Sequence, residues 1–220
     1  MADGGATYQH DTRIAAGGTQ LPARLEMPGE AAGVVVYVPG GRSELSSGHG
    51  RYLSERFVEA GYGVVRVDLL TADEDRGFSA RSDTERLAAR LLAVMRWVAE
   101  HEPTHGLPLG LYAAHTGADA ALRALAELAA EGGEYLVRCL VCRSARPDQA
   151  GEHLDLVNVP TLLLVAAGDA EGLRRNRGAL AHLDGESTLE VVGEASADFD
   201  EDRAVERLAA RSVAWYERYL

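Results

Sequence analysis

The sequence predicts an α/β protein with a doubly wound, mostly parallel sheet, helices on both faces and no separate cap domain. Two observations support this prediction. Short apolar runs typical of buried strands alternate with longer segments of helical periodicity, and this alternation is the pattern of βαβ units. The chain also has no repeat, linker or low-complexity tract, so residues 1–220 are expected to form a single domain.

Eight segments are candidate strands. The five most apolar are residues 34–38, 62–67, 107–114, 136–142 and 161–167, and the three weaker ones are residues 7–14, 20–27 and 188–192. The first two weaker segments flank Gly17-Gly18, which predicts an antiparallel hairpin at the start of the sheet.

Five helices are expected between and after these strands. The first covers residues 51–60 and stops at Gly61, and the second begins with a capping box, Ser82-Asp-Thr-Glu85, and continues through Val98. The others cover residues 116–130, 173–183 and 203–219. Ligands of such sheets bind outside the carboxyl ends of the strands, so the residues that follow each strand are the candidates for function.

Composition excludes several classes of function. All 22 basic residues are arginines, which rules out a Schiff-base lysine or a phosphate-loop lysine. The net charge of −12 argues against nucleic acid or an anionic membrane as partner. No apolar run reaches the ~20 residues that cross a bilayer, and the N-terminus lacks an export signal, so we expect a cytoplasmic protein. The histidines lack metal-ligand spacing, so no metal or cofactor is expected.

A strand runs directly into a helix across Ala113-Ala-His115-Thr-Gly117. Small residues two before and two after the turn are what a strained nucleophile elbow requires. With the glycine turn at Pro39-Gly40-Gly41 and Gly168-Asp169 after a later strand, the chain resembles small α/β hydrolases of the dienelactone-hydrolase-like group from about residue 34 to its end. The segments that begin at Asp68, Arg143 and Pro160 also resemble recurring family segments.

The chain departs from this family at two positions of the catalytic triad. His115 stands where the family has its nucleophilic serine, and Ser196, or Ala197 under a one-residue slip, stands where it has its histidine. Of the triad pattern only Asp169 remains, and an acid at that position also often caps the following helix. The usual serine-esterase mechanism is therefore not available.

The resemblance implies that the backbone oxyanion hole remains, formed by N–H groups of Thr116 and of Gly40 or Gly41. The positive end of the helix after the elbow disfavours a cationic His115, which keeps a neutral imidazole available as a base. A base beside an oxyanion hole is suited to removing a proton next to a carbonyl and holding the enolate. The candidate substrate-binding residues are Arg42, Asp68, Arg143 and Arg146.

The leading hypothesis is a tailoring enzyme that acts on a small carbonyl-containing molecule or a modified peptide, with His115 as general acid/base and Asp169 or Ser196 in support. Epimerisation, isomerisation, cyclisation and elimination all fit this chemistry. Some members of this fold epimerise a residue in a modified peptide and also lack the normal triad. The chain is similar to them in that respect. One alternative is an inactive binding protein. The other is a hydrolase that uses a water activated by His115 or a swapped His115/Ser196 dyad. The sequence leaves open whether the chain forms a homodimer.

Overall fold

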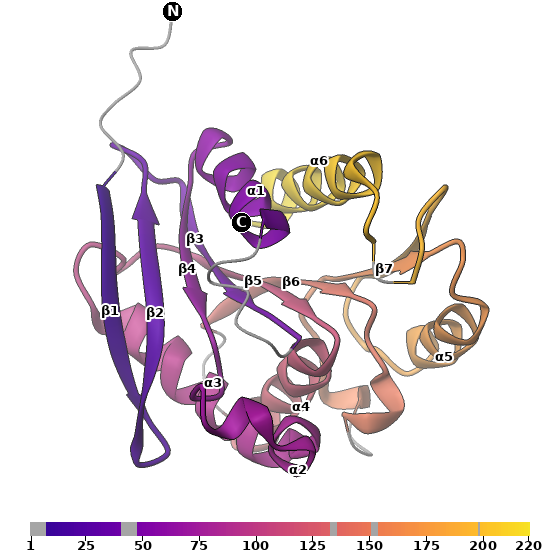
Figure 1. Ribbon diagram of the computed structural model, residues 1–220, viewed down its shortest axis with the longest axis horizontal. Coiled ribbons are helices and arrows are strands. Elements are labelled where there is room, and N and C mark those ends of the chain that lie inside the picture. Colours follow the sequence, from indigo (N-terminus) through magenta and orange to yellow (C-terminus); the bar gives the residue numbers. More distant parts are fainter. Residues whose placement is uncertain (1–7, 41–47, 133–135, 151–153, 198) are drawn as a thin grey trace, which may run out of the picture.

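The computed structural model describes residues 8–40, 48–132, 136–150, 154–197 and 199–220. Its centre is an eight-stranded sheet with the strand order β1-β2-β4-β3-β5-β6-β7-β8. Helices α1 and α6 cover one face, and α3 and α4 cover the other (Figure 1). The antiparallel pairs are β1–β2 and β2–β4, and the other neighbours are parallel. This arrangement confirms the predicted fold class.

The elements have the following bounds. The strands are β1 (Tyr8–Ala16), β2 (Thr19–Met27), β3 (Gly33–Val38), β4 (Tyr62–Val67), β5 (Leu109–Ala114), β6 (Val137–Arg143), β7 (Thr161–Ala166) and β8 (Ser187–Val192). The α-helices are α1 (Gly48–Glu59), α2 (Phe78–Ser82), α3 (Thr84–Glu100), α4 (Thr116–Ala130), α5 (Ala170–Leu180) and α6 (Asp202–Tyr219). Among the described residues there are also three short 3₁₀ helices, η2 (Glu74–Arg76), η3 (Pro147–Gln149) and η4 (Leu154–Leu156).

The sheet separates two hydrophobic cores, one under each helical layer. Successive strand residues face opposite sides, so Cys142 contributes to the core below α3 and α4, and Cys139 to the core below α1 and α6. The predicted hairpin is confirmed: Gly17 and Gly18 turn between β1 and β2 with φ values of 57° and 76°, which glycine adopts without steric cost.

Most helix starts differ from the prediction. Helix α1 begins at Gly48 and not at residue 51, α6 begins at Asp202 and not at residue 203, and the short helix α2 was not predicted. The capping box at Ser82 is wrong, because Ser82 ends α2 and Asp83 is the cap of α3, its carboxylate accepting from the Arg86 N–H at 3.1 Å. Helix α5 begins three residues earlier than predicted, at Ala170, because Asp169 caps its first turn. Among the described residues, no helix is both long and apolar enough to cross a membrane.

Candidate functional site

His115 lies in the turn between β5 and α4 with φ 49° and ψ −122°. Its N–H donates to the Arg143 carbonyl at 2.9 Å, and its own carbonyl accepts from Asp119 N–H at 3.2 Å in the first turn of α4. A non-glycine residue in this conformation carries backbone strain of about 1–3 kcal/mol. The surrounding hydrogen bonds therefore hold the imidazole-bearing residue in a fixed, strained elbow.

The elbow is packed so closely against the glycine turn that neither Gly117 nor Gly40 has room for a side chain. A Cβ at Gly117 would lie 2.5 Å from the Pro39 carbonyl oxygen and 2.9 Å from the Val38 carbonyl oxygen. A Cβ at Gly40 would collide with the His115 Cβ. The glycine turn after β3 therefore lies directly against the elbow. In this arrangement one backbone N–H of the turn and one of the elbow could face the same ligand atom.

An open cleft of about 1000 Å³ lies at this end of the sheet. Six chain segments contribute to its wall: the glycine turn, the start of α1, the elbow, the loop after β6, the segment after β7 and the segment after β8. The lining residues are Gly40, Gly48, His49, His115, Thr116, Arg143, Ser144, Ala145, Arg146, Asp169, Glu171, Gly172, Arg175, Ala197 and Asp200. The cleft thus brings together most of the residues that the sequence analysis selected.

Asp169 reaches the cleft as a helix cap. Its Oδ1 accepts from the Gly172 N–H at 2.8 Å, which satisfies one unpaired donor in the first turn of α5. The carboxylate lies on the cleft wall and its observed contact is with the helix. Of the two roles expected for this acid, the structure therefore shows helix capping.

Ser196 interacts with the start of α6. Its hydroxyl donates to Glu201 Oε2 at 3.3 Å and accepts from the Asp200 N–H at 3.3 Å. Its backbone N–H also donates to the Glu201 carboxylate, and this bond lowers the pKa of Glu201. Ala197, the alternative under a one-residue slip, lines the cleft.

The predicted substrate-binding residues do not all lie at the same cavity. Arg143 is buried in the cleft wall with its guanidinium over the Phe199 ring at 5.7 Å, and Arg146 lines the same cleft. Asp68 is buried beside a second cavity of about 110 Å³, which shares Thr116 with the first. Gly41 and Arg42 lie outside the described residues.

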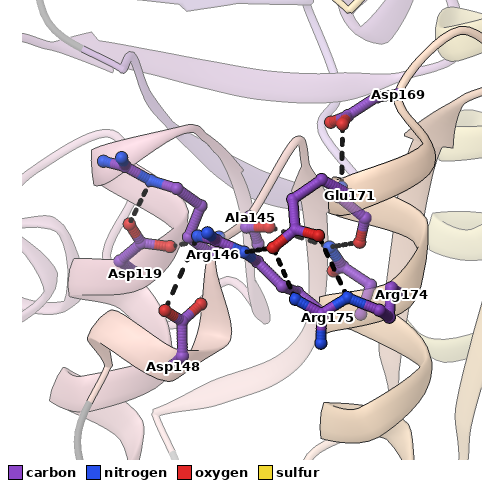
Figure 2. Close-up of polar contacts among 10 residues, drawn as sticks. Asp119, Ala145, Arg146, Asp148, Asp169, Glu171, Arg174 and Arg175 are labelled. Atoms are coloured by element: carbon purple, nitrogen blue, oxygen red, sulfur yellow. Dashed lines mark hydrogen bonds and ion pairs between the residues drawn. The ribbon is translucent and has the colours of Figure 1, made fainter.

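Sequence reasoning missed a polar network in the wall of the cleft. Figure 2 shows acidic and basic side chains alternating from α4 to α5, from Asp119 and Arg146 to Asp148, Arg175 and Glu171. Asp119 is 1% exposed, accepts from the Arg146 N–H at 2.6 Å and lies 3.8 Å from Arg146 Nε. Burial raises the pKa of Asp119 to about 7. A signal was available, because Asp119 is the acid in the first turn of an alanine-rich helix, four residues after His115.

Backbone strain is concentrated around the cleft. Besides His115, Ser144 with φ 52° lines the cleft and Phe199 with φ 57° supports Arg143. The Ser144 hydroxyl lies 3.5 Å from the Ala197 carbonyl oxygen, which joins the loops after β6 and β8. Residues in such conformations cluster at binding and catalytic sites. Within the described ranges, no three histidine, cysteine or acidic side chains are grouped so as to hold a metal ion.

Comparisons with known proteins agree with this architecture. No family model matches the chain. A crystal structure of dienelactone hydrolase from Anabaena variabilis superposes with a TM-score of 0.89 and 31% identity, covering 97% of this chain and 99% of that one. Est1E from Butyrivibrio proteoclasticus, at 14% identity and a TM-score of 0.74, covers 94% of this chain and 98% of its own, and shares the fold.

A curated relative from Mycobacterium tuberculosis carries the name "Putative phosphoribosyl transferase". It is 36% identical over 210 residues, which make up 96% of this chain and 46% of that protein. The chain therefore spans about half the length of the curated relatives that it matches.

Proposed function

Because this chain belongs to the dienelactone-hydrolase-like proteins of the α/β-hydrolase fold, we propose that it is a tailoring enzyme with a non-serine mechanism. Its substrate is a small carbonyl-containing molecule or a modified peptide, and His115 is the general acid/base. The proposal rests on the cleft and not on the name of the longer mycobacterial relatives.

One observation supports this proposal above the others. His115, in its strained elbow conformation, lines the same cleft as Gly40 and Thr116, whose backbones are the expected oxyanion hole. The elbow conformation costs folding free energy, and a chain that used this turn only for structure would gain stability from glycine at residue 115. The presence of a titratable side chain in this costly conformation supports a chemical role.

The proposed reaction begins with a substrate carbonyl oxygen facing the N–H groups of Thr116 and Gly40. An imidazole nitrogen of His115 takes the proton from the neighbouring carbon as that C–H bond breaks. The electron pair moves to the carbonyl oxygen, and the enolate is stabilised by the two N–H groups. Delivery of a proton from water to the opposite face of the enolate, with the His115 proton passing to solvent, completes an epimerisation. Departure of a leaving group from the next carbon, with its bonding electron pair, completes an elimination.

The alternatives each have a structural requirement. A swapped dyad would need the Ser196 hydroxyl to leave Glu201 and Asp200 and to turn towards the cleft. A binding protein without catalysis is favoured by the engagement of Asp169 with α5, because that carboxylate already accepts a hydrogen bond from the helix. A His115-activated water would hydrolyse esters with the same base and the same oxyanion hole.

We expect His115→Asn to lower proton exchange at least about 100-fold, because it removes the acid/base and keeps a residue that tolerates positive φ. Protein-dependent deuterium incorporation into pyruvate, acetoacetate and 2-oxoglutarate in D₂O, followed by NMR, measures this. His49→Asn is the matched control, since His49 is exposed on the same cleft. Exchange that is absent in the wild type, or unchanged in His115→Asn, would contradict the proposal. Release of p-nitrophenol from p-nitrophenyl acetate that depends on His115 would favour hydrolysis instead.

A further inference from the structure

We infer that the second cavity, beside Thr116, binds a neutral alkyl arm of about three or four carbon atoms on the substrate's carbonyl carbon. This inference deepens the proposed function, because it names the class of substrate: a carbonyl compound with a short, uncharged alkyl arm. It rests on the proposed function only for the position of the carbonyl group. Binding tests it without any reaction at His115.

The cavity and the cleft meet at the residues that are expected to hold the carbonyl oxygen. Thr116 lines both of them, Gly40 lines the cleft, and the neighbouring Pro39 and Gly117 line the cavity. A molecule whose carbonyl oxygen faces the Thr116 N–H therefore has two places for its substituents, one in the open cleft and one in the small cavity.

The wall of the cavity is mostly apolar. Leu69 and Leu70 follow β4, Leu87 lies on α3, and all three side chains are buried. Pro22 and Pro39 add further apolar surface. Such a wall favours alkyl groups, because they gain free energy on leaving water and need no hydrogen-bond partner.

The charged residues around the cavity exclude an anionic arm. They are Asp68 and Asp75, and the described lining contains no arginine. A carboxylate or phosphate in this cavity would lose its hydration and gain no positive partner. Both aspartates already have interaction partners within the protein, so neither is a spare counter-ion for a cationic arm. The arm that fits is therefore neutral.

The volume of the cavity limits the length of the arm. It is about 110 Å³. A carbon atom of an alkyl chain takes up about as much space as a molecule of liquid water, ~30 Å³, so about three or four carbon atoms fill it. The cleft of about 1000 Å³ receives the remainder of the molecule.

A buried ion pair holds the wall in place. Arg90 on α3 is 4% exposed and donates to the Leu69 carbonyl at 2.8 Å. Both of its terminal nitrogens donate to the Glu74 carboxylate at 2.8 Å, and the Thr71 N–H donates to the same carboxylate at 2.9 Å. The hydrogen bonds from Arg90 lower the pKa of Glu74 to about 2, so this carboxylate stays ionised at neutral pH. The cavity is thus formed before a ligand enters, which reduces the entropy cost of binding.

Titration with acetone, methyl propyl ketone, methyl butyl ketone and methyl hexyl ketone tests the cavity. Binding is followed by NMR through the amide signals of Leu70 and Leu87 in isotope-labelled protein. We expect the dissociation constant to fall about three- to fourfold with each added carbon up to the butyl arm, the effect of one buried methylene. The hexyl arm should gain less than about twofold more, because it exceeds the cavity.

Ala72→Phe should raise the dissociation constant of methyl butyl ketone at least about tenfold. Ala72 lines the cavity and is exposed, so a phenyl ring there fills its mouth. Ala130→Phe is the matched control, because Ala130 is exposed at the end of α4 away from the elbow. Leu87→Ala should enlarge the cavity, so that methyl hexyl ketone binds more tightly than methyl butyl ketone.

Three results would overturn the inference: no ketone binding at these signals, a dissociation constant independent of arm length, or equal weakening by Ala72→Phe and Ala130→Phe. Levulinate, whose arm ends in a carboxylate, should leave the Leu70 and Leu87 signals unchanged, and a shift would contradict the neutral arm. Ketone binding that persists in His115→Asn, without proton exchange in the wild type, would support the cavity and contradict only the proposed reaction.

Discussion

Replacement of Gly117 by alanine is expected to destabilise the fold by about 3 kcal/mol or more, because the new methyl group has no space to occupy. Its Cβ would lie 2.5 Å from the Pro39 carbonyl oxygen and 2.9 Å from that of Val38. Both atoms belong to the backbone of β3 and its glycine turn, so relief requires the end of β3 and the elbow to separate. Urea unfolding followed by circular dichroism measures the loss.

Gly178→Ala is the control for this prediction. Gly178 lies inside α5, and a Cβ there would have no neighbouring atom within 4 Å. Alanine should therefore stabilise the protein by about 0.5–1 kcal/mol through its higher helix propensity. If Gly117→Ala behaved in the same way as Gly178→Ala, the elbow would not be closely packed against the glycine turn, and the argument for a preserved oxyanion hole would lose its structural basis.

Asp119→Asn is expected to stabilise the protein at pH 8 by up to about 4 kcal/mol, because it removes the cost of ionising a buried carboxyl. Burial raises the pKa of Asp119 from its ordinary value of 3.8 to about 7 in the folded protein. The asparagine side-chain oxygen can still accept from the Arg146 N–H, which Asp119 now accepts at 2.6 Å.

The direction in which stability changes with pH follows from proton binding to Asp119. Between about pH 4 and pH 7 the folded protein holds a proton on Asp119 and the unfolded chain does not, so the wild type loses stability as the pH rises through this range. The advantage of the variant should grow by about 1.4 kcal/mol per pH unit there and level off above pH 7. Denaturant unfolding at pH 5, 6, 7 and 8 measures it.

Asp148→Asn provides the comparison, since it removes a half-exposed carboxylate from the same network. We expect it to leave the pH dependence close to that of the wild type. An Asp119→Asn variant with the same pH dependence as the wild type would show that Asp119 is ionised throughout this range. In that case Arg146, 3.8 Å away, would compensate the carboxylate more strongly than burial penalises it.

Local pattern predicted much of the fold. Strand β4 (Tyr62–Val67) and helix α4 (Thr116–Ala130) have the predicted bounds, and the other strands lie within three residues of theirs. Errors fell at helix starts such as Asp83 and Asp169, where a single carboxylate decides which residue begins the helix. Several serine, threonine and acidic residues near a boundary can act as caps, and only the final backbone path selects one of them.

The sequence by itself determined the elbow and what the elbow lacks. The apolar run before Ala114, the small residues around His115 and the alanine-rich helix after it are neighbours along the chain, and local sterics require a strand-to-helix turn there. The absence of a serine at residue 115 and of a histidine after β8 can also be read directly from the chain.

Only the tertiary structure decided how the other candidates are used. Asp169 caps α5, Ser196 binds Glu201, and Arg175 enters the cleft beside Arg146. Asp119 is removed from water by strands and loops distant in the sequence, and its pKa is raised for that reason. Periodicity and spacing report contacts between near neighbours along the chain. Burial, partner choice and charge compensation depend on segments that meet only when the sheet is assembled.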